Sequence, residues 1–516
     1  MASLIPAQTS DSRIFIAPSR ASCGAAYTYH SCMRMEGVDK SFGDITSVYC
    51  PHPTKTGEFV EIAQIQGADG RWTTSLVGRL PLNYQSIIAQ LANKKCAFDL
   101  QVHFGKCFDP TNFNTFEMSY VFENVRISSY SLGTLGALGP DERATIDETV
   151  AISAETAYQL FPVYPNSSGA NITPNGPVPT MAYGNYVSCT DCLDSCGRFY
   201  GLQLPATTLA SQDVYIVWTD DGGLTWSSTT LPCSSAQLTN PIASYVIKSD
   251  GTNLYITLNE SGGTGHLYIV PISEVEDGTI TSSIFSVLDN TNTIYATFMY
   301  QTDFWTAGAN GVVNLVDKAS QSYTVIEDGT TFTNDWFAMH GIDSDNLIFG
   351  GEGGILAVRR NGGSLQAVTF AVNSVTVTSD ITSVWMKSED EWLVGTEAGN
   401  LYCTTDSGST WTLAQTFSGC VRDINFPRNS TGYIVIKSPA QIWRTYDGGG
   451  TWVQVTDKYK QIASTTEFFG VSTCPDNPNT FVVNGQIPSV TVANPCDTSG
   501  TLFTTGSTGV LMVGRQ

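Results

Sequence analysis

The chain has 516 residues, a formal net charge of −22, only 14% charged residues and 47 glycines. Its length predicts two or more domains, and low charge content with abundant glycine favours short strands joined by tight turns over long helices. The acidic balance argues against a protein that grips nucleic-acid phosphates. Because the chain starts without a signal-like segment and has no long apolar run, we expect a protein made in the cytosol without a membrane span.

The first third of the chain shows the alternation of apolar and polar residues that is typical of strands. One segment in this part, residues 83–95, instead has Ile87, Ile88 and Leu91 at helical spacing. Two strands, a helix and several further strands predict a β-sandwich or closed sheet with one helix against it, preceded by an extended arm over residues 1–20. The predicted strands cover residues 57–66, 71–80, 97–105, 118–133 and 148–158.

A change in composition marks a boundary between two domains. Residues 161–188 are rich in Pro, Asn, Ser and Gly and have neither a strand nor a helix period, which is typical of a linker or extended arm. Acidic residues also become dominant here, with 16 Asp/Glu against 12 Lys/Arg in residues 1–163 and 31 against 13 in residues 164–516. We therefore predict a β domain over 1–163, a linker over 164–194 and a second domain over 195–516.

An octet repeats three times in the second domain, as TDDGGLTW at 219–226, TTDSGSTW at 404–411 and TYDGGGTW at 445–452. In each copy an Asp carboxylate can accept bonds from backbone N–H groups one or two residues further on. A Gly can take a positive φ, and a Trp can bury its ring beside the next strand. We therefore predict a structural role for Asp221, Gly223, Trp226, Asp406, Gly408, Trp411, Asp447, Gly449 and Trp452.

Weaker versions of the same frame, a strand followed by a turn, recur between and after the octets. Together they place seven turns 41 to 60 residues apart, and a period near 45 residues filled with short strands is typical of a β-propeller. A β-solenoid would show shorter and stricter repeats. We therefore predict an all-β protein with a seven-bladed β-propeller, whose last repeat holds an insertion closed by a disulfide between Cys474 and Cys496.

The thirteen cysteines include one tight cluster, formed by Cys189, Cys192 and Cys196. A CxxC spacing supplies half of a zinc site, but no matching second half lies nearby. Free or disulfide-bonded thiols are therefore favoured over a metal site at this cluster.

The octet resembles the Asp-box of sialidase-type propellers, whose pattern is S/T-x-D-x-G-x-T-W. The resemblance implies that the octet lies in the hairpin before the outermost strand of a blade, away from the active face. A sialidase also needs three clustered arginines and an Arg-Ile-Pro-type motif in the first blade, and that motif is missing. We therefore expect no enzyme activity, no catalytic residue and no cofactor. The arginines of the second domain are Arg198, Arg359, Arg360, Arg422, Arg428, Arg444 and Arg515.

Two segments of the first domain, GEFVEIAQIQGADGRWTTSLVGRLP (57–81) and VFENVRISSYSLGTLGALGPDERATIDETVAISAETAYQL (121–160), resemble tail tube proteins of tailed bacteriophages. The resemblance implies a virion protein, assembled in the host cytoplasm, that forms hexameric rings stacked into a tail tube. Its partners would be further copies, other tail proteins and DNA that passes through the lumen without sequence-specific contact. The propeller would then be an outward decoration that contacts host surface glycans.

Three other interpretations of the sequence stay open. The first domain suits any β-sandwich adhesin joined to a propeller. The propeller itself suits a glycan-binding or glycan-cleaving enzyme, or an assembly factor that binds proteins through the propeller face.

Overall fold

The computed structural model divides the chain into two units, which we treat separately. Unit 1 comprises residues 1–21 and 25–162, and unit 2 comprises residues 22–24 and 163–516. Nearly all described elements are strands, so the predicted all-β class is confirmed. The described residues are 12–40, 45–51, 59–66, 70–81, 86–105, 113, 116, 118–133, 145–160, 172–174, 185–192, 198–205, 214–220, 226–232, 246–259, 265–281, 292–301, 303–317, 322–455, 467–474, 477–487, 491–493, 501–504 and 508–514.

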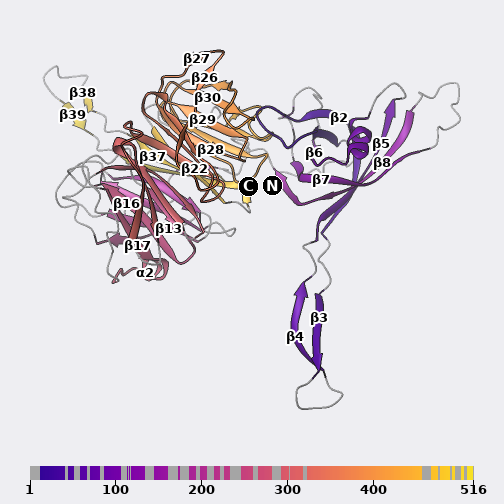
Figure 1. The fold of residues 1–516 in the computed structure, drawn as a ribbon, viewed down its shortest axis with the longest axis horizontal. Helices are drawn as coiled ribbons and strands as arrows, with labels where there is room; N and C mark the ends of the chain where they lie inside the picture. The colour runs from indigo at the N-terminus through magenta and orange to yellow at the C-terminus, as the bar shows by residue number, and fades with distance from the viewer. Residues whose placement is uncertain are drawn as a thin grey trace. The chain divides into compact units, whose positions relative to one another are not determined.

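Unit 1 is built on one antiparallel sheet whose strands close on themselves (Figure 1). The strand order is β6-β1-β2-β5-β8-β7-β9, and β7 also pairs with β6. The long strand β7 makes this closure possible, because its first half pairs with β6 and its second half with β8. The strands are β1 (Arg13–Ala17), β2 (Thr28–Lys40), β5 (Trp72–Pro81), β6 (Phe98–Phe104), β7 (Met118–Leu132), β8 (Thr145–Ala154) and β9 (Thr156–Leu160).

The predicted N-terminal arm is wrong for residues 13–17. These residues form β1, which pairs with β2 on one side and β6 on the other, and all five are buried. The reason lies in the apolar run Ile14–Ala17, which suits a strand covered on both faces. Residues 1–11 lie outside the described residues.

The single helix of unit 1, α1 (Ile87–Lys94), begins at a polar cap that also reaches the sheet. The Ser86 hydroxyl accepts the Ala89 N–H at 3.2 Å and donates to Glu148 Oε1 at 2.5 Å. His30 Nε2 lies 3.4 Å from the other Glu148 oxygen. Burial raises the pKa of Glu148, but its bonds to His30, Ser86 and Tyr130 outweigh burial and leave the pKa below its usual value.

A two-stranded hairpin of unit 1 stands outside the closed sheet. Strands β3 (Ile45–Pro51) and β4 (Phe59–Gln66) pair with each other and with no other described strand. The outer edges of both strands thus have no partner among the described strands of unit 1.

Unit 2 contains, within its described residues, seven antiparallel sheets of three or four strands. Small additions are α2 (Ile272–Glu276) and the strand pairs β26 (Ala371–Val372) with β27 (Val375–Thr376) and β38 (Thr491–Ala493) with β39 (Thr501–Thr504). The first five sheets are β11 (Asn185–Cys192), β12 (Phe199–Pro205), β13 (Val214–Thr219), β14 (Ser227–Leu231); β15 (Val246–Ser249), β16 (Asn253–Asn259), β17 (Gly265–Pro271); β18 (Ile294–Tyr300), β19 (Asp303–Gly308), β20 (Val312–Asp317), β21 (Ser322–Asp328); β22 (Trp336–Gly341), β23 (Leu347–Gly351), β24 (Leu356–Arg359), β25 (Gln366–Ala367); and β28 (Ile381–Met386), β29 (Trp392–Thr396), β30 (Asn400–Thr404), β31 (Thr412–Thr416). The remaining two are β32 (Val421–Asn425), β33 (Gly432–Ile436), β34 (Gln441–Thr445), β35 (Val453–Gln454); and β36 (Glu467–Cys474), β37 (Asn477–Ile487), β40 (Thr508–Gly514), β10 (Ile172–Pro174).

The sheets of unit 2 are arranged in a ring. Their innermost strands contact one another in the order β11, β15, β18, β22, β28, β32 and β36, and β36 contacts β11 again. Apolar side chains of neighbouring sheets fill the space between them, as where Trp392 meets Ile348 and Val358 of the preceding sheet. A closed ring of small antiparallel sheets is a β-propeller.

The predicted linker over residues 164–194 is wrong, because this segment supplies two strands of the ring. β11 is the innermost strand of the first sheet, and β10 pairs with β40 near the C-terminus. β10 is a three-residue strand at the edge of its sheet, where Pro and polar residues are tolerated. The composition of the segment therefore did not indicate this strand. Near the C-terminus β40 completes the last sheet by pairing with β37, whereas β39 pairs with β38 outside it.

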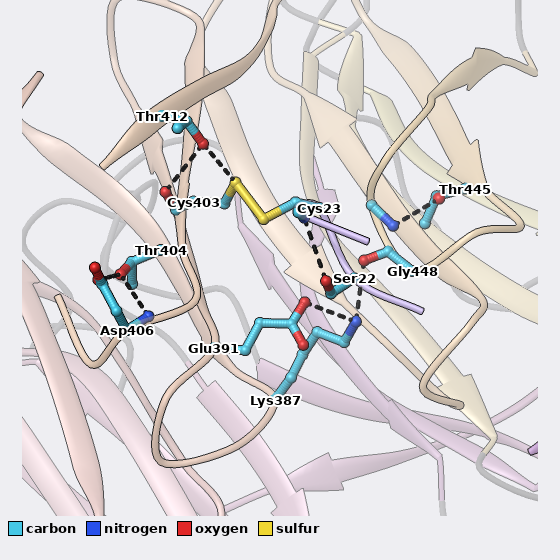
Figure 2. Close-up of a disulfide and its surroundings, with 12 residues drawn as sticks. Ser22, Cys23, Lys387, Glu391, Cys403, Thr404, Asp406, Thr412, Thr445 and Gly448 are labelled. Atoms are coloured by element: carbon cyan, nitrogen blue, oxygen red, sulfur yellow. Dashed lines mark hydrogen bonds and ion pairs between the residues drawn. A yellow bond between two sulfur atoms is a disulfide. The ribbon is translucent and has the colours of Figure 1, made fainter. Parts of the chain in front are cut away.

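A disulfide ties residues 22–24 to β30 within unit 2 (Figure 2). Cys23 bonds to Cys403, and 380 residues of sequence separate them. Nearby, Lys387 Nζ lies 3.1 Å from Glu391 Oε1 and donates to the Gly448 carbonyl at 3.0 Å. A bond between such distant positions restricts the unfolded chain over most of its length.

Candidate functional site: the cavity of unit 2

A cavity of about 420 Å³ lies where the innermost strands of unit 2 meet. Every innermost strand contributes to its walls, and Asn484 of β37 adds one side chain. The volume falls within the range of about 300–1,000 Å³ that small-ligand sites occupy. The cavity is therefore the candidate functional site.

A recurring β-bulge shapes the walls of the cavity. The pairing register shifts at the same place in six of the innermost strands, for example between Val421 and Asp423 in β32. A bulge re-aims the side chain of its extra residue. Five such residues line the cavity, and we call them the bulge layer: Tyr295, Phe337, Thr382, Arg422 and Phe469.

A second set of side chains occupies matching register positions further along the same strands, and we call it the distal layer. His340 stacks on Trp385 with 3.7 Å between ring centroids and meets Phe298 at 5.5 Å. The members are Asp191, Lys248, Phe298, His340, Trp385, Asn425 and Ser472. One side of this layer is thus aromatic and the other polar.

His340 is a neutral member of the distal layer. Desolvation by the surrounding protein, with a smaller effect of Lys248, lowers the pKa of His340 to about 3. Its Nδ1 accepts the Met386 N–H at 3.1 Å, which fits the neutral ring.

Two carboxylates and two cations share the cavity. Lys248 Nζ lies 3.2 Å from Asp191 Oδ1. Asp423 accepts the N–H groups of Ile424 and Val471 at 2.9 Å. Burial raises the pKa of Asp423 to about 6, although these bonds and the charges of Lys248 and Arg422 oppose the rise.

Most of the hydrogen bonds around the cavity join one sheet to the next. Asp191 accepts the Ser249 N–H at 2.9 Å, and the Asp423 and His340 bonds likewise reach a neighbouring sheet. The Thr382 hydroxyl donates to the Val421 carbonyl at 2.6 Å. These hydrogen bonds therefore link neighbouring sheets of the ring. They also occupy backbone N–H and carbonyl groups of the innermost strands.

Arg422 differs from the other described arginines of unit 2. Arg359 and Arg360 donate to the carbonyls of Gly362 and Ser407, and Arg444 is fully buried against Asn479. In the described part of the chain, no hydrogen bond or ion pair occupies the Arg422 guanidinium. It is also the sole arginine among the described lining residues, so the three-arginine cluster of a sialidase is absent from these walls.

The predicted octet residues lie away from the cavity. The octets at 404–411 and 445–452 connect the third strand of a sheet to the fourth, and none of their residues lines the cavity. Gly408 and Gly449 have φ of 84° and 105°. The rings of Trp226, Trp411 and Trp452 are buried. Asp221 and Gly223 lie outside the described residues.

The two described octets share one hydrogen-bond pattern, and it differs from the predicted one. The Asp carboxylate accepts the Thr N–H four residues further on at 2.8 Å, in Asp406–Thr410 and in Asp447–Thr451. The first Thr of the octet donates to the same carboxylate at 2.8 Å. The carboxylate thus spans the whole loop, whereas we predicted bonds one or two residues on.

The structure describes only some of the cysteines for which we made predictions. Cys474 is buried and disulfide-bonded, but Cys496 lies outside the described residues, so their pairing stays a prediction. The side chains of Cys189, Cys192 and Cys196 are likewise not described. Among the described residues no group of three His, Cys, Asp or Glu side chains could hold a metal ion.

Sequence reasoning missed the cavity residues. Phe298, His340, Trp385, Asn425 and Ser472 recur 40 to 47 residues apart, which matches the repeat period. Aligning the strand that begins each repeat, rather than the turn that ends it, would have brought them together.

No described helix is long and apolar enough to cross a membrane.

Comparisons with known proteins find similar solved structures but no matching sequence. No protein-family model matches the chain, and no curated protein matches its sequence. Among solved structures, "YCF48 bound to D1 peptide" is similar at 11% identity with a TM-score of 0.47, over 68% of this chain and 97% of that one. YCF48 from Cyanidioschyzon merolae gives 11% and 0.46, over 67% and 98%. The WD40 propeller domain of Doa1 gives 11% and 0.44, over 65% and 94%.

Proposed function

We propose that the protein is a structural subunit that assembles with copies of itself, and that its propeller binds glycans. Unit 1 forms stacked rings, hexameric as in the tail tubes that its sequence resembles, and DNA passes through the lumen of the resulting virion tail. Unit 2 is a seven-bladed propeller whose octets are Asp-box turns, and it decorates the tube. The role is structural, without catalysis.

The β3–β4 hairpin is the observation that carries self-assembly. It has two strands with free edges, and in the described part of unit 1 they pair with no third strand. Isolated two-stranded hairpins are at best marginally stable in water, and open strand edges are sites of pairing between chains. A neighbouring copy of unit 1 would supply the missing partner.

Replacing residues 45–66 with a short Gly-Ser linker tests this assembly. Because the closed sheet of unit 1 is paired without the hairpin, the variant is expected to keep its fold. Size-exclusion chromatography with light scattering should give a multimer for the wild-type protein and a monomer for the variant. Equal masses for the two proteins, with matching circular dichroism spectra, would contradict assembly through the hairpin.

A further inference from the structure

Arg422 presents to the cavity a guanidinium that has no hydrogen-bond or ion-pair partner among the described residues. It is the bulged residue of β32, and it lines the cavity wall. Its charge lowers the pKa of Asp423, but that carboxylate already accepts two backbone N–H groups. The planar fork of N–H donors on Arg422 therefore remains for a molecule in the cavity, and such a fork matches the two oxygens of a carboxylate.

The neighbours of Arg422 in the bulge layer suit a ligand with both apolar and hydroxyl groups. Phe337 offers aromatic surface, and Tyr295 meets Phe337 with 5.6 Å between ring centroids. Burial raises the pKa of Tyr295, so its hydroxyl stays protonated and can donate a hydrogen bond. The Thr297 hydroxyl, on the same strand, is buried and has no hydrogen-bond partner among the described residues.

The backbone of the cavity wall argues against an added peptide strand. A peptide that extends a sheet needs free backbone groups on the edge strand. Here the N–H groups of Ser249, Met386 and Val471 are each occupied by a side chain of the neighbouring sheet, and so is the Val421 carbonyl. A ligand is therefore recognised by the side chains of the cavity, which can bind carboxylate and hydroxyl groups.

We infer that the cavity binds an acidic sugar, with its carboxylate on the Arg422 guanidinium and its ring against the aromatic side chains of the bulge layer. The apolar C–H face of a sugar ring can cover an aromatic ring while its hydroxyls reach Tyr295 and Thr297. The inference rests on the glycan-binding role proposed for unit 2, and it is independent of ring assembly by unit 1.

Titration of the full-length protein with small sugars tests this inference. N-acetylneuraminic acid and glucuronic acid are the acidic probes, N-acetylglucosamine and glucose the neutral ones, and a triglycine peptide with an acetylated N-terminus the alternative carboxylate source. Binding is measured by isothermal titration calorimetry and by saturation-transfer NMR. At least one acidic sugar should bind saturably and at least tenfold more tightly than either neutral sugar, as expected for a charge-assisted contact.

Variants of Arg422 locate the site. Arg422→Ala should weaken acidic-sugar binding at least tenfold, and Arg422→Lys, which keeps the charge without the fork, should weaken it less. Arg126→Ala removes an exposed arginine of unit 1 and should leave binding unchanged. Melting curves establish that each variant is folded.

Four results would overturn the inference. They are no binding of either acidic sugar, equal binding of neutral and acidic sugars, unchanged binding by a folded Arg422→Ala protein, and preferential binding of the peptide. The mass of the assembled protein, measured on the same samples, separates these results from a failure of ring assembly.

Discussion

At the scale of single residues, the two described octets differ in how deeply their aspartates lie. Asp447 is 2% exposed, whereas Asp406 is partly exposed. Burial raises the pKa of Asp447, and hydrogen bonds from Thr410 lower that of Asp406. The same turn therefore depends on its carboxylate to different degrees in the two copies.

Replacing each aspartate separately should reveal this difference. Asp447→Ala leaves the buried Thr445 hydroxyl and the partly buried Thr451 N–H without their acceptor, so we expect a loss of about 2 kcal/mol in the unfolding free energy of unit 2. Asp406→Ala is the matched control with the smaller effect, because water can reach its turn. Denaturant unfolding followed by tryptophan fluorescence measures both, and equal losses would show that burial does not set the cost.

Asp423 should make sugar binding depend on pH. With a pKa of about 6, its carboxyl group is neutral at pH 5 and charged at pH 7.5. A charged Asp423 repels the sugar carboxylate and attracts Arg422, so binding should be roughly tenfold tighter at pH 5. The sugar carboxylate stays ionised in this range, since such groups titrate at about 3–4.

The other titratable groups near Asp423 could also affect the pH dependence of sugar binding. His340 stays neutral because its pKa is about 3, and Lys248 is paired with Asp191. Calorimetry at the two pH values should therefore give a flat profile for Asp423→Asn. A variant that kept the wild-type pH dependence would assign the effect to another group.

At the scale of elements, the link between residues 22–24 and β30 depends on one disulfide. A bond that closes so long a stretch of chain contributes about 2–4 kcal/mol. Cys23→Ser should therefore lower the unfolding temperature of unit 2, as measured by differential scanning calorimetry without reductant. Cys96→Ser, at an exposed free cysteine, is the control and should unfold like the wild type. A Cys23→Ser protein that did the same would contradict a stabilising role.

Local patterns predicted elements well where the pattern itself determines the structure. The apolar spacing at Ile87, Ile88 and Leu91 predicted α1, and the helix buries Ile88 and Leu91. The turn residues of the octets marked the ends of strands β30 and β34. β10 was missed because it is only three residues long and its partner β40 lies far away in the sequence. β1 was missed because its apolar run Ile14–Ala17, buried on both faces, does not alternate between apolar and polar residues.

At the scale of the whole molecule, the repeat period predicted the propeller. It did not predict where the propeller begins or which residues line its cavity. The ring begins at β11, within the segment that composition marked as a linker. The cavity unites residues from Asp191 to Asn484, and it exists only because the ring closes. No local pattern could show that Arg422 has no hydrogen-bond partner among the described residues, whereas Arg359, Arg360 and Arg444 each have one.

Self-assembly through unit 1 is the central claim, and negative-stain electron microscopy of the purified full-length protein tests it most directly. We predict rings of about six copies, or stacked tubes that carry peripheral lobes. The variant lacking residues 45–66 should give single particles on the same grids. Single compact particles of the wild-type protein at high concentration would contradict the claim.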